Sequence, residues 1–169
     1  MMAPAMVLSM AAKKKQEKKL RILFVDSKND LSSQLAEHYA RKMFSDRYEV
    51  YSAGPEHDIV DCDLLSVMYC AGEDLRDLVS KDFSDDRFFP RDEGFDFVVY
   101  TEKPVFDRLA KKSPWQGRQI CAHMGTREEF TATDDAELAD QLLAMADRVS
   151  KWVAENLADP EKLRSLISA

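Results

Sequence analysis

The sequence predicts a single α/β domain built on an open parallel sheet. Short apolar segments rich in β-branched and aromatic residues alternate with longer segments whose apolar residues recur at helical spacing. With 45% hydrophobic and 33% charged residues among 169, the composition is that of an ordinary globular chain with one sizeable core. We therefore expect parallel strands in one sheet, with helices on both of its faces.

The first strand, loop and helix organise the rest of the chain. We expect a buried strand at residues 22–25 and a helix at residues 34–44, in which Leu35, Tyr39 and Met43 recur at helical spacing. Asp30 or Ser32 would cap that helix. Free backbone N–H groups converge in a loop between a strand and a helix N-terminus, so residues 26–33 are the candidate anion site.

The remaining elements follow in alternation. A second strand ends in a glycine turn, the next helix is ended by Gly72, Pro104 opens the first turn of another helix, and acidic residues favour the start of a long amphipathic helix. The expected ranges are strand 48–54, helix 59–71, strand 95–100, a helix from 104, strand 118–122, helix 134–157 and a short helix from 160.

Charge and cysteine content exclude several functions. The net charge is −7, and the acidic residues lie mostly in the body, which argues against nucleic-acid binding. Cys62, Cys70 and Cys121 are far apart and form no CxxC pair, so we expect no metal and no cofactor. Separate free cysteines also predict a reducing, cytoplasmic location.

The N-terminal segment is the most basic part of the chain. Residues 1–12 are mildly apolar and are followed by a lysine-rich run, which is the reverse of the order in a signal peptide. No apolar run is long enough for a membrane helix. We expect an arm at 1–19 that is solvated or docks on an acidic surface, a domain at 20–158 and a short helical tail at 159–169.

The loop carries a resemblance to a known family. Residues 25–37 read V-D-S-K-N-D-L-S-S-Q-L-A-E, which resembles the V-C-x-G-N-x-C-R-S-P-x-A-E loop of the low-molecular-weight protein tyrosine phosphatases and related arsenate reductases. Asn29, Ser33, Ala36 and Glu37 match that pattern. Elsewhere the chain resembles the family at S-A-G (52–54), at A-G-E-D-L (71–75), at S-K (80–81) and at F-D-F-V-V (95–99). The resemblance covers roughly residues 20–157 and implies strand order 2-1-3-4.

The same comparison shows what the loop has lost. Asp26 falls where the family has its nucleophilic cysteine, Lys28 replaces a glycine, and Ser32 replaces the arginine that grips phosphate. An ionised aspartate would repel phosphate, serine offers no bidentate positive group, and Lys28 would simply neutralise Asp26. Phosphatases with an aspartate nucleophile need Mg²⁺ and further carboxylates, usually with a second aspartate at the position of Lys28.

The positions of the candidate anion loop are therefore degenerate, and we expect no catalysis. They are Asp26, Ser27, Lys28, Asn29, Asp30, Leu31, Ser32 and Ser33. The resemblance implies a phosphatase-like protein without cysteine chemistry, acting as a regulatory or binding module toward a protein partner.

A general acid is also missing from its expected place. The family carries an aspartate in a D-P loop after the fourth strand, but residues 123–130 contain no such pair. Glu128 and Glu129 are the remaining acid candidates, and a solvated charge run is the simpler interpretation. His123 matches a histidine of the arsenate-reductase branch, although a lone histidine is more often structural.

Two alternatives stay open. The protein would be an active phosphatase or arsenate reductase if another nucleophile replaced the cysteine; Cys70 and Arg76 have the C-x5-R spacing, but Cys70 is expected at a helix end. A receiver-like signalling domain would explain residues 22–26 and Asp30. It leaves the S-A-G turn unexplained, and the third strand ends at residues 100–103, much further along the chain than the phosphoacceptor aspartate of a receiver domain.

Overall fold

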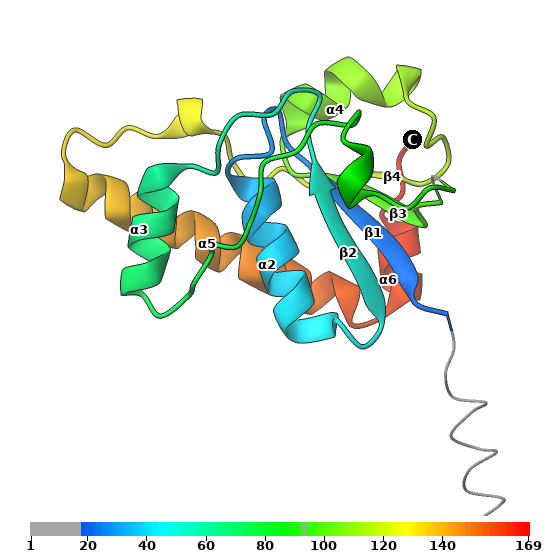
Figure 1. The fold of residues 1–169 in the computed structure, drawn as a ribbon, viewed down its shortest axis with the longest axis horizontal. Helices are drawn as coiled ribbons and strands as arrows, with labels where there is room; N and C mark the ends of the chain where they lie inside the picture. Colours follow the sequence, from blue (N-terminus) through cyan, green and yellow to red (C-terminus); the bar gives the residue numbers. More distant parts are fainter. Residues whose placement is uncertain (1–17, 93) are drawn as a thin grey trace, which may run out of the picture.

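The computed structural model describes residues 18–92 and 94–169, and Figure 1 shows a sheet flanked by helices. Strands and helices alternate through most of the described chain. The elements are β1 (Leu20–Val25), α2 (Ser32–Phe44), β2 (Tyr48–Ala53), α3 (Cys62–Cys70), η1 (Asp86–Phe88), β3 (Phe97–Tyr100), α4 (Lys103–Leu109), η2 (Ala110–Lys112), β4 (Gln119–Cys121), η3 (Arg127–Glu129), α5 (Asp135–Leu157) and α6 (Pro160–Ser165).

The predicted sheet is confirmed. It has four parallel strands in the order β2-β1-β3-β4, with β1 between β2 and β3. Ile22 of β1 lies opposite Val50 on one side and Phe97 on the other. The unbroken apolar run of β1 is therefore explained, because a central strand in a parallel sheet is buried on both faces.

Alternate residues of β1 serve two different cores. Ile22 and Phe24 belong to the larger cluster, which also contains residues of α2, α3, α5 and α6. Leu23 and Val25 belong to a smaller cluster with Val105 of α4. Figure 1 shows the consequence, with α2, α3 and α5 grouped on one side of the sheet and α4 on the other.

Two helix starts differ from the sequence-based expectation. Helix α2 begins at Ser32, and neither Asp30 nor Ser32 caps it: the N-cap position is Leu31, which makes no side-chain capping bond. Helix α3 begins at Cys62 rather than at 59, because the carboxylate of Asp61 accepts a hydrogen bond from the Leu64 N–H and fixes the start there. The first change is explained by Asp26, described below.

The C-terminal residues close one edge of the sheet. Leu163 of α6 is fully buried in the larger core, and the backbone N–H of Ser168 donates to the carbonyl of Gln119 in β4. The predicted N-terminal arm lies almost entirely outside the described residues. Within the described chain, every helix is too short or too polar to span a bilayer.

Candidate functional site

The candidate site is the loop between β1 and α2, at the carboxyl edge of the sheet. The chain passes so close to the next strand that Gly54 has no room for a side chain. A Cβ there would lie 2.5 Å from the carbonyl oxygen of Asp26 and 3.0 Å from the backbone nitrogen of Asn29. The S-A-G turn therefore has a packing reason: only glycine lets the two backbones approach this closely.

The carboxylate of Asp26 fills the centre of the loop. Asp26 is fully buried, and its two oxygens accept hydrogen bonds from the backbone N–H groups of Asp30 (3.3 Å), Leu31 (3.2 Å) and Ser33 (2.9 Å). Burial raises the pKa of Asp26, and the hydrogen bonds from Ser33, Leu31 and Asp30 act in the opposite direction. These donors lie at the start of α2, where a free anion would otherwise bind.

This arrangement replaces the missing helix cap. The first N–H groups of a helix have no partner within the helix, and a nearby side chain usually accepts them. Here the Asp26 carboxylate accepts them, five residues before Leu31 and seven residues before Ser33. The protein's own carboxylate thus occupies the position that the loop offers to an anion.

Asn29 holds the shape of the loop. It is fully buried and has a φ of 50°, in the left-handed region that asparagine tolerates better than most residues. Its Nδ2 donates to the Ser33 hydroxyl at 2.9 Å, and its Oδ1 accepts from the backbone N–H of Lys81 and from Nε2 of Gln34, both at 2.9 Å. The loop is therefore tied to α2 and to the segment that follows α3.

The end of β3 supplies two further contacts, which the sequence did not identify. The Ser32 hydroxyl shares a 2.8 Å hydrogen bond with the Thr101 hydroxyl, and both residues are fully buried. The carboxylate of Glu102 accepts the backbone N–H of Ser27 at 3.0 Å. A polar pair directly after the apolar strand was the available signal, because neighbouring parallel strands end at the same edge.

The loop region is strongly acidic. Burial, followed by the charge of Asp26, raises the pKa of Asp30 to about 7, and the same two causes raise that of Glu102 to about 7. Glu128 adds a smaller upward effect on Glu102. The surroundings of Asp26 thus disfavour further negative charge.

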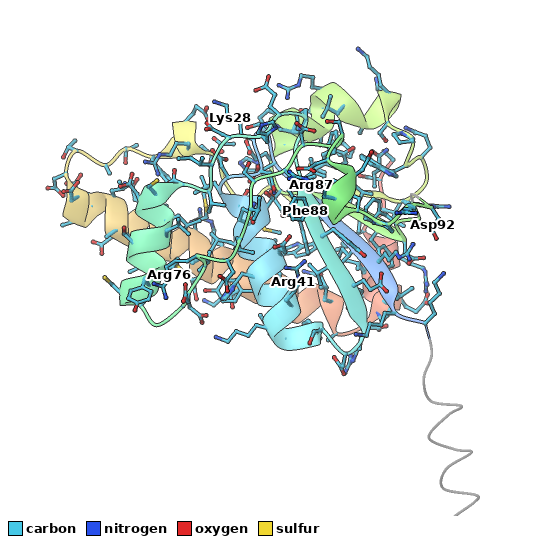
Figure 2. The ribbon with its side chains drawn as sticks, viewed as in Figure 1. Lys28, Arg41, Arg76, Arg87, Phe88 and Asp92 are labelled. Carbon is cyan, nitrogen blue, oxygen red and sulfur yellow. The ribbon has the colours of Figure 1, made fainter. Side chains whose placement is uncertain are left out.

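Lys28 does not neutralise Asp26, so that expectation was wrong. Its side chain is exposed, and Figure 2 shows it at the outer edge of the molecule, above the loop. In residues 18–92 and 94–169, no ion pair joins it to Asp26. The Asp26 carboxylate is instead stabilised by hydrogen bonds from backbone N–H groups.

A second buried network supports the loop from below. Oε1 of Glu37 accepts the Ser52 hydroxyl at 2.9 Å and lies 3.6 Å from Nζ of Lys81, while its other oxygen lies 3.2 Å from Arg41. Glu37 and Lys81 are almost completely buried, and burial lowers the pKa of Lys81. Several residues that match the family pattern therefore meet in one structural cluster.

The acid candidates are exposed. Glu129 lies 2.5 Å from Nε2 of His123, whose Nδ1 accepts the backbone N–H of Lys103 at 2.9 Å. Glu128 is also exposed. Between Thr126 and Phe130, Arg127 extends to Asp61 and Asp63 and so joins this turn to the start of α3.

The C-x5-R segment has no cradle. Cys70 is the last residue of α3 and is exposed. The N–H groups of Ala71, Gly72 and Glu73 donate back to helix carbonyls, so they do not converge on an anion. Arg76 binds Asp74 instead.

No cluster of three metal-ligating side chains occurs in the described part of the chain. The candidate site is thus a strand–loop–helix segment of a four-stranded parallel α/β domain, in which the converging N–H groups donate to an internal carboxylate.

Comparison with solved structures identifies the fold. A protein tyrosine phosphatase from Entamoeba histolytica matches with a TM-score of 0.63 and 18% identity over 85% of this chain and 97% of its own. The tyrosine phosphatase AmsI of Erwinia amylovora matches with a TM-score of 0.60 and 18% identity over 83% and 95%. An arsenate reductase in its phosphate-binding state matches with a TM-score of 0.54 and 18% identity over 80% and 98%.

The protein therefore has the fold of the low-molecular-weight tyrosine phosphatases, as the loop and the S-A-G turn predicted. No protein-family model and no curated protein matches the chain.

Proposed function

We propose that this protein is a catalytically inactive relative of the low-molecular-weight phosphatases that acts as a regulatory or binding module. One observation carries the proposal: the carboxylate of Asp26 accepts the N–H groups of Asp30, Leu31 and Ser33. A phosphoryl group needs those donors, because they stabilise the charge that develops on its oxygens. In this loop they already bind an anion of the same chain.

The replacement of the family's cysteine by Asp26 and of its arginine by Ser32 also argues against catalysis. A carboxylate held by three N–H groups has its lone pairs directed into the loop, so it is a poor nucleophile. Ser32 bonds to Thr101 in a fully buried position, and no guanidinium of the loop is available to bind a phosphate.

The binding half of the proposal rests on exposed apolar side chains beside the loop. Ile59 is 65% exposed and Val79 is 45% exposed. Nearby residues contact the loop directly: the backbone N–H of Asp61, two residues after Ile59, donates to the carbonyl of Asp30, and the hydroxyl of Ser80, next to Val79, donates to the carbonyl of Lys28. A protein partner would bury this apolar pair.

The first test is hydrolysis of an aryl phosphate by purified wild-type, Asp26→Ala and Cys70→Ser proteins. We expect all three to equal a vector control. Wild-type turnover that is lost in Asp26→Ala would refute inactivity, and loss in Cys70→Ser would instead assign chemistry to the end of α3.

The second test concerns binding. A partner that copurifies with the tagged protein should be lost when Ile59 and Val79 are both replaced by serine. Leu166→Ser is the control, because Leu166 is 37% exposed at the C-cap of α6, near the C-terminus. Equal loss in the control would show that the partner binds elsewhere.

A further inference from the structure

A hollow of about 880 Å³ lies on the α4 side of the sheet, apart from the loop. Its floor is formed by Leu23 of β1, Tyr100 of β3 and Phe95, all of which are buried. Two segments form its walls, residues 83–91 around η1 and residues 109–115 from the end of α4 onward. Hollows of this size are typical of sites for small organic molecules.

The walls are mainly aromatic. Phe83 and Trp115 meet edge to face with ring centroids 5.3 Å apart, and Phe95 contacts Trp115 at 6.2 Å and Phe89 at 6.4 Å. The two walls are therefore held at a defined spacing by their own rings. Such walls favour a flat, apolar ligand body, which can stack on the rings or meet their edges.

The rim is basic, although the chain as a whole carries a net charge of −7. Arg87, Arg91 and Lys112 line the hollow, and Asp86 is the one acid among the described residues that line it. Arg87 is held by Asp85 at 2.9 Å, and Figure 2 shows it on η1 beside Phe88. Lys112 has no ion-pair partner among the residues that the structure describes.

We propose that this hollow binds a small amphiphilic anion, with an aromatic or other apolar body packed against the aromatic side chains of the walls and a carboxylate, sulfonate or phosphate group at the basic rim. An inorganic anion would leave the aromatic walls in contact with water, and a neutral hydrocarbon would make no use of the positive charges at the rim. The site shares no residue with the loop, so it stands independently of whether the loop is inactive.

Anilinonaphthalene sulfonate, a fluorescent aromatic sulfonate, is a suitable probe, and the uncharged phenylnaphthylamine is its comparison. We expect saturable binding of the sulfonate to one site on the full-length protein, and weaker binding of the neutral dye. Non-saturable binding, or equal affinity for both dyes, would overturn the proposal.

Two pairs of variants locate the site. Phe83→Ala should weaken dye binding several-fold. Phe88→Ala is the control and should leave binding unchanged, because Phe88 is equally exposed (37%, against 36% for Phe83) but does not line the hollow. Lys112→Glu should weaken sulfonate binding about fivefold, the effect of turning one exposed ion pair into a repulsion, and leave the neutral dye unchanged. Lys111→Glu, its exposed neighbour outside the hollow, should change neither.

Equal effects of Lys111→Glu and Lys112→Glu would show that the dye senses overall charge and would overturn the proposal. The lysine pair decides alone if circular dichroism shows that Phe83→Ala unfolds. Leu8→Asp tests whether the apolar N-terminal segment competes with the dye for the hollow. A gain in dye affinity in this variant would assign the hollow to that segment and would also overturn the proposal.

Discussion

Replacing Asp26 by alanine is the most direct perturbation of the loop. The change removes the acceptor of three backbone N–H groups, of which those of Leu31 and Ser33 are in fully buried bonds. Leaving a buried donor without a partner costs about 1–3 kcal/mol each. The change also relieves the burial of one carboxylate, which offsets part of that cost.

We expect Asp26→Ala to lower the free energy of unfolding by about 3 kcal/mol, which corresponds to about 6–12 °C in Tm for a domain of this size. Asp26→Asn should lose less, because its amide oxygen can still accept the N–H groups that converge on Oδ2. Chemical denaturation and thermal melts of the three proteins measure this order.

The missing carboxylate can be returned as formate. Asp26→Ala leaves the N–H groups free around a space of carboxylate size, so its Tm should rise with formate concentration at constant ionic strength. At ten times Kd, the gain is about 1.4 kcal/mol. Wild type and Asp26→Asn should not respond, because their side chains fill the space.

The matched control is Asp30→Ala, a neighbouring acid whose side chain does not bond to the N–H groups of the loop. It should be neutral or stabilising, since its pKa of about 7 reports an unfavourable charge. The reasoning is refuted if Asp26→Ala is as stable as wild type, or if formate stabilises wild type equally.

Three further predictions test the frame of the site. Gly54→Ala should cost about 2–4 kcal/mol, because its Cβ would meet backbone atoms at 2.5–3.0 Å, whereas Gly94→Ala, with its nearest contact at 3.5 Å, should be nearly neutral in the same denaturation assay. Glu37→Gln should destabilise the protein by about 3 kcal/mol, because it leaves the buried Lys81 ammonium without its carboxylate partner. Lys81→Met should cost less, because Glu37 keeps its contacts with Arg41 and Ser52. The reverse order would contradict this account. Glu102, with its pKa raised to about 7, keeps its proton in the folded state between about pH 4 and pH 7, where the unfolded chain has lost it. Its contribution to the free energy of unfolding is therefore lost as pH rises through that range, and Glu102→Gln should flatten this part of the stability–pH curve. An unchanged slope would argue against the raised pKa.

The fold was largely predictable from the sequence, for a physical reason. A buried parallel strand must be apolar on both faces, which made residues 22–25 and 95–100 recognisable, and glycine and proline marked the turns. The strand order came from the family resemblance alone. Helix boundaries were less predictable, because the start of α3 depends on which of several acidic residues accepts the first N–H groups.

The strand, loop and helix around Asp26 were predictable from the sequence, but the contacts of the Asp26 side chain were not. The sequence identified Asp26 as an anion-excluding residue, on the ground that its charge repels phosphate. It could not show that the carboxylate turns into the loop and binds its N–H groups, since that depends on a backbone path set by Gly54 and by Asn29 at positive φ. Glu102 was missed as a site residue for the same reason, because its contact with Ser27 joins two different strand ends.

The positions that match the family pattern and the positions that differ from it have different physical roles. Asn29, Ser33, Glu37 and Ser52, which match the family pattern, form hydrogen bonds that hold the loop and the segment at Lys81 in place. None of these bonds needs a thiolate or a phosphate. The shape of such a loop is therefore separable from phosphatase chemistry, and in this protein it is held by hydrogen bonds made within the chain.

Asp26 then explains how such a frame remains stable without a ligand. A set of converging N–H groups is costly when it is buried and empty, since each donor loses its water. A tethered carboxylate satisfies the donors at every moment and needs no external anion. Repulsion alone would leave those groups unpaired, so occupancy is the stronger physical reason for an aspartate at this position.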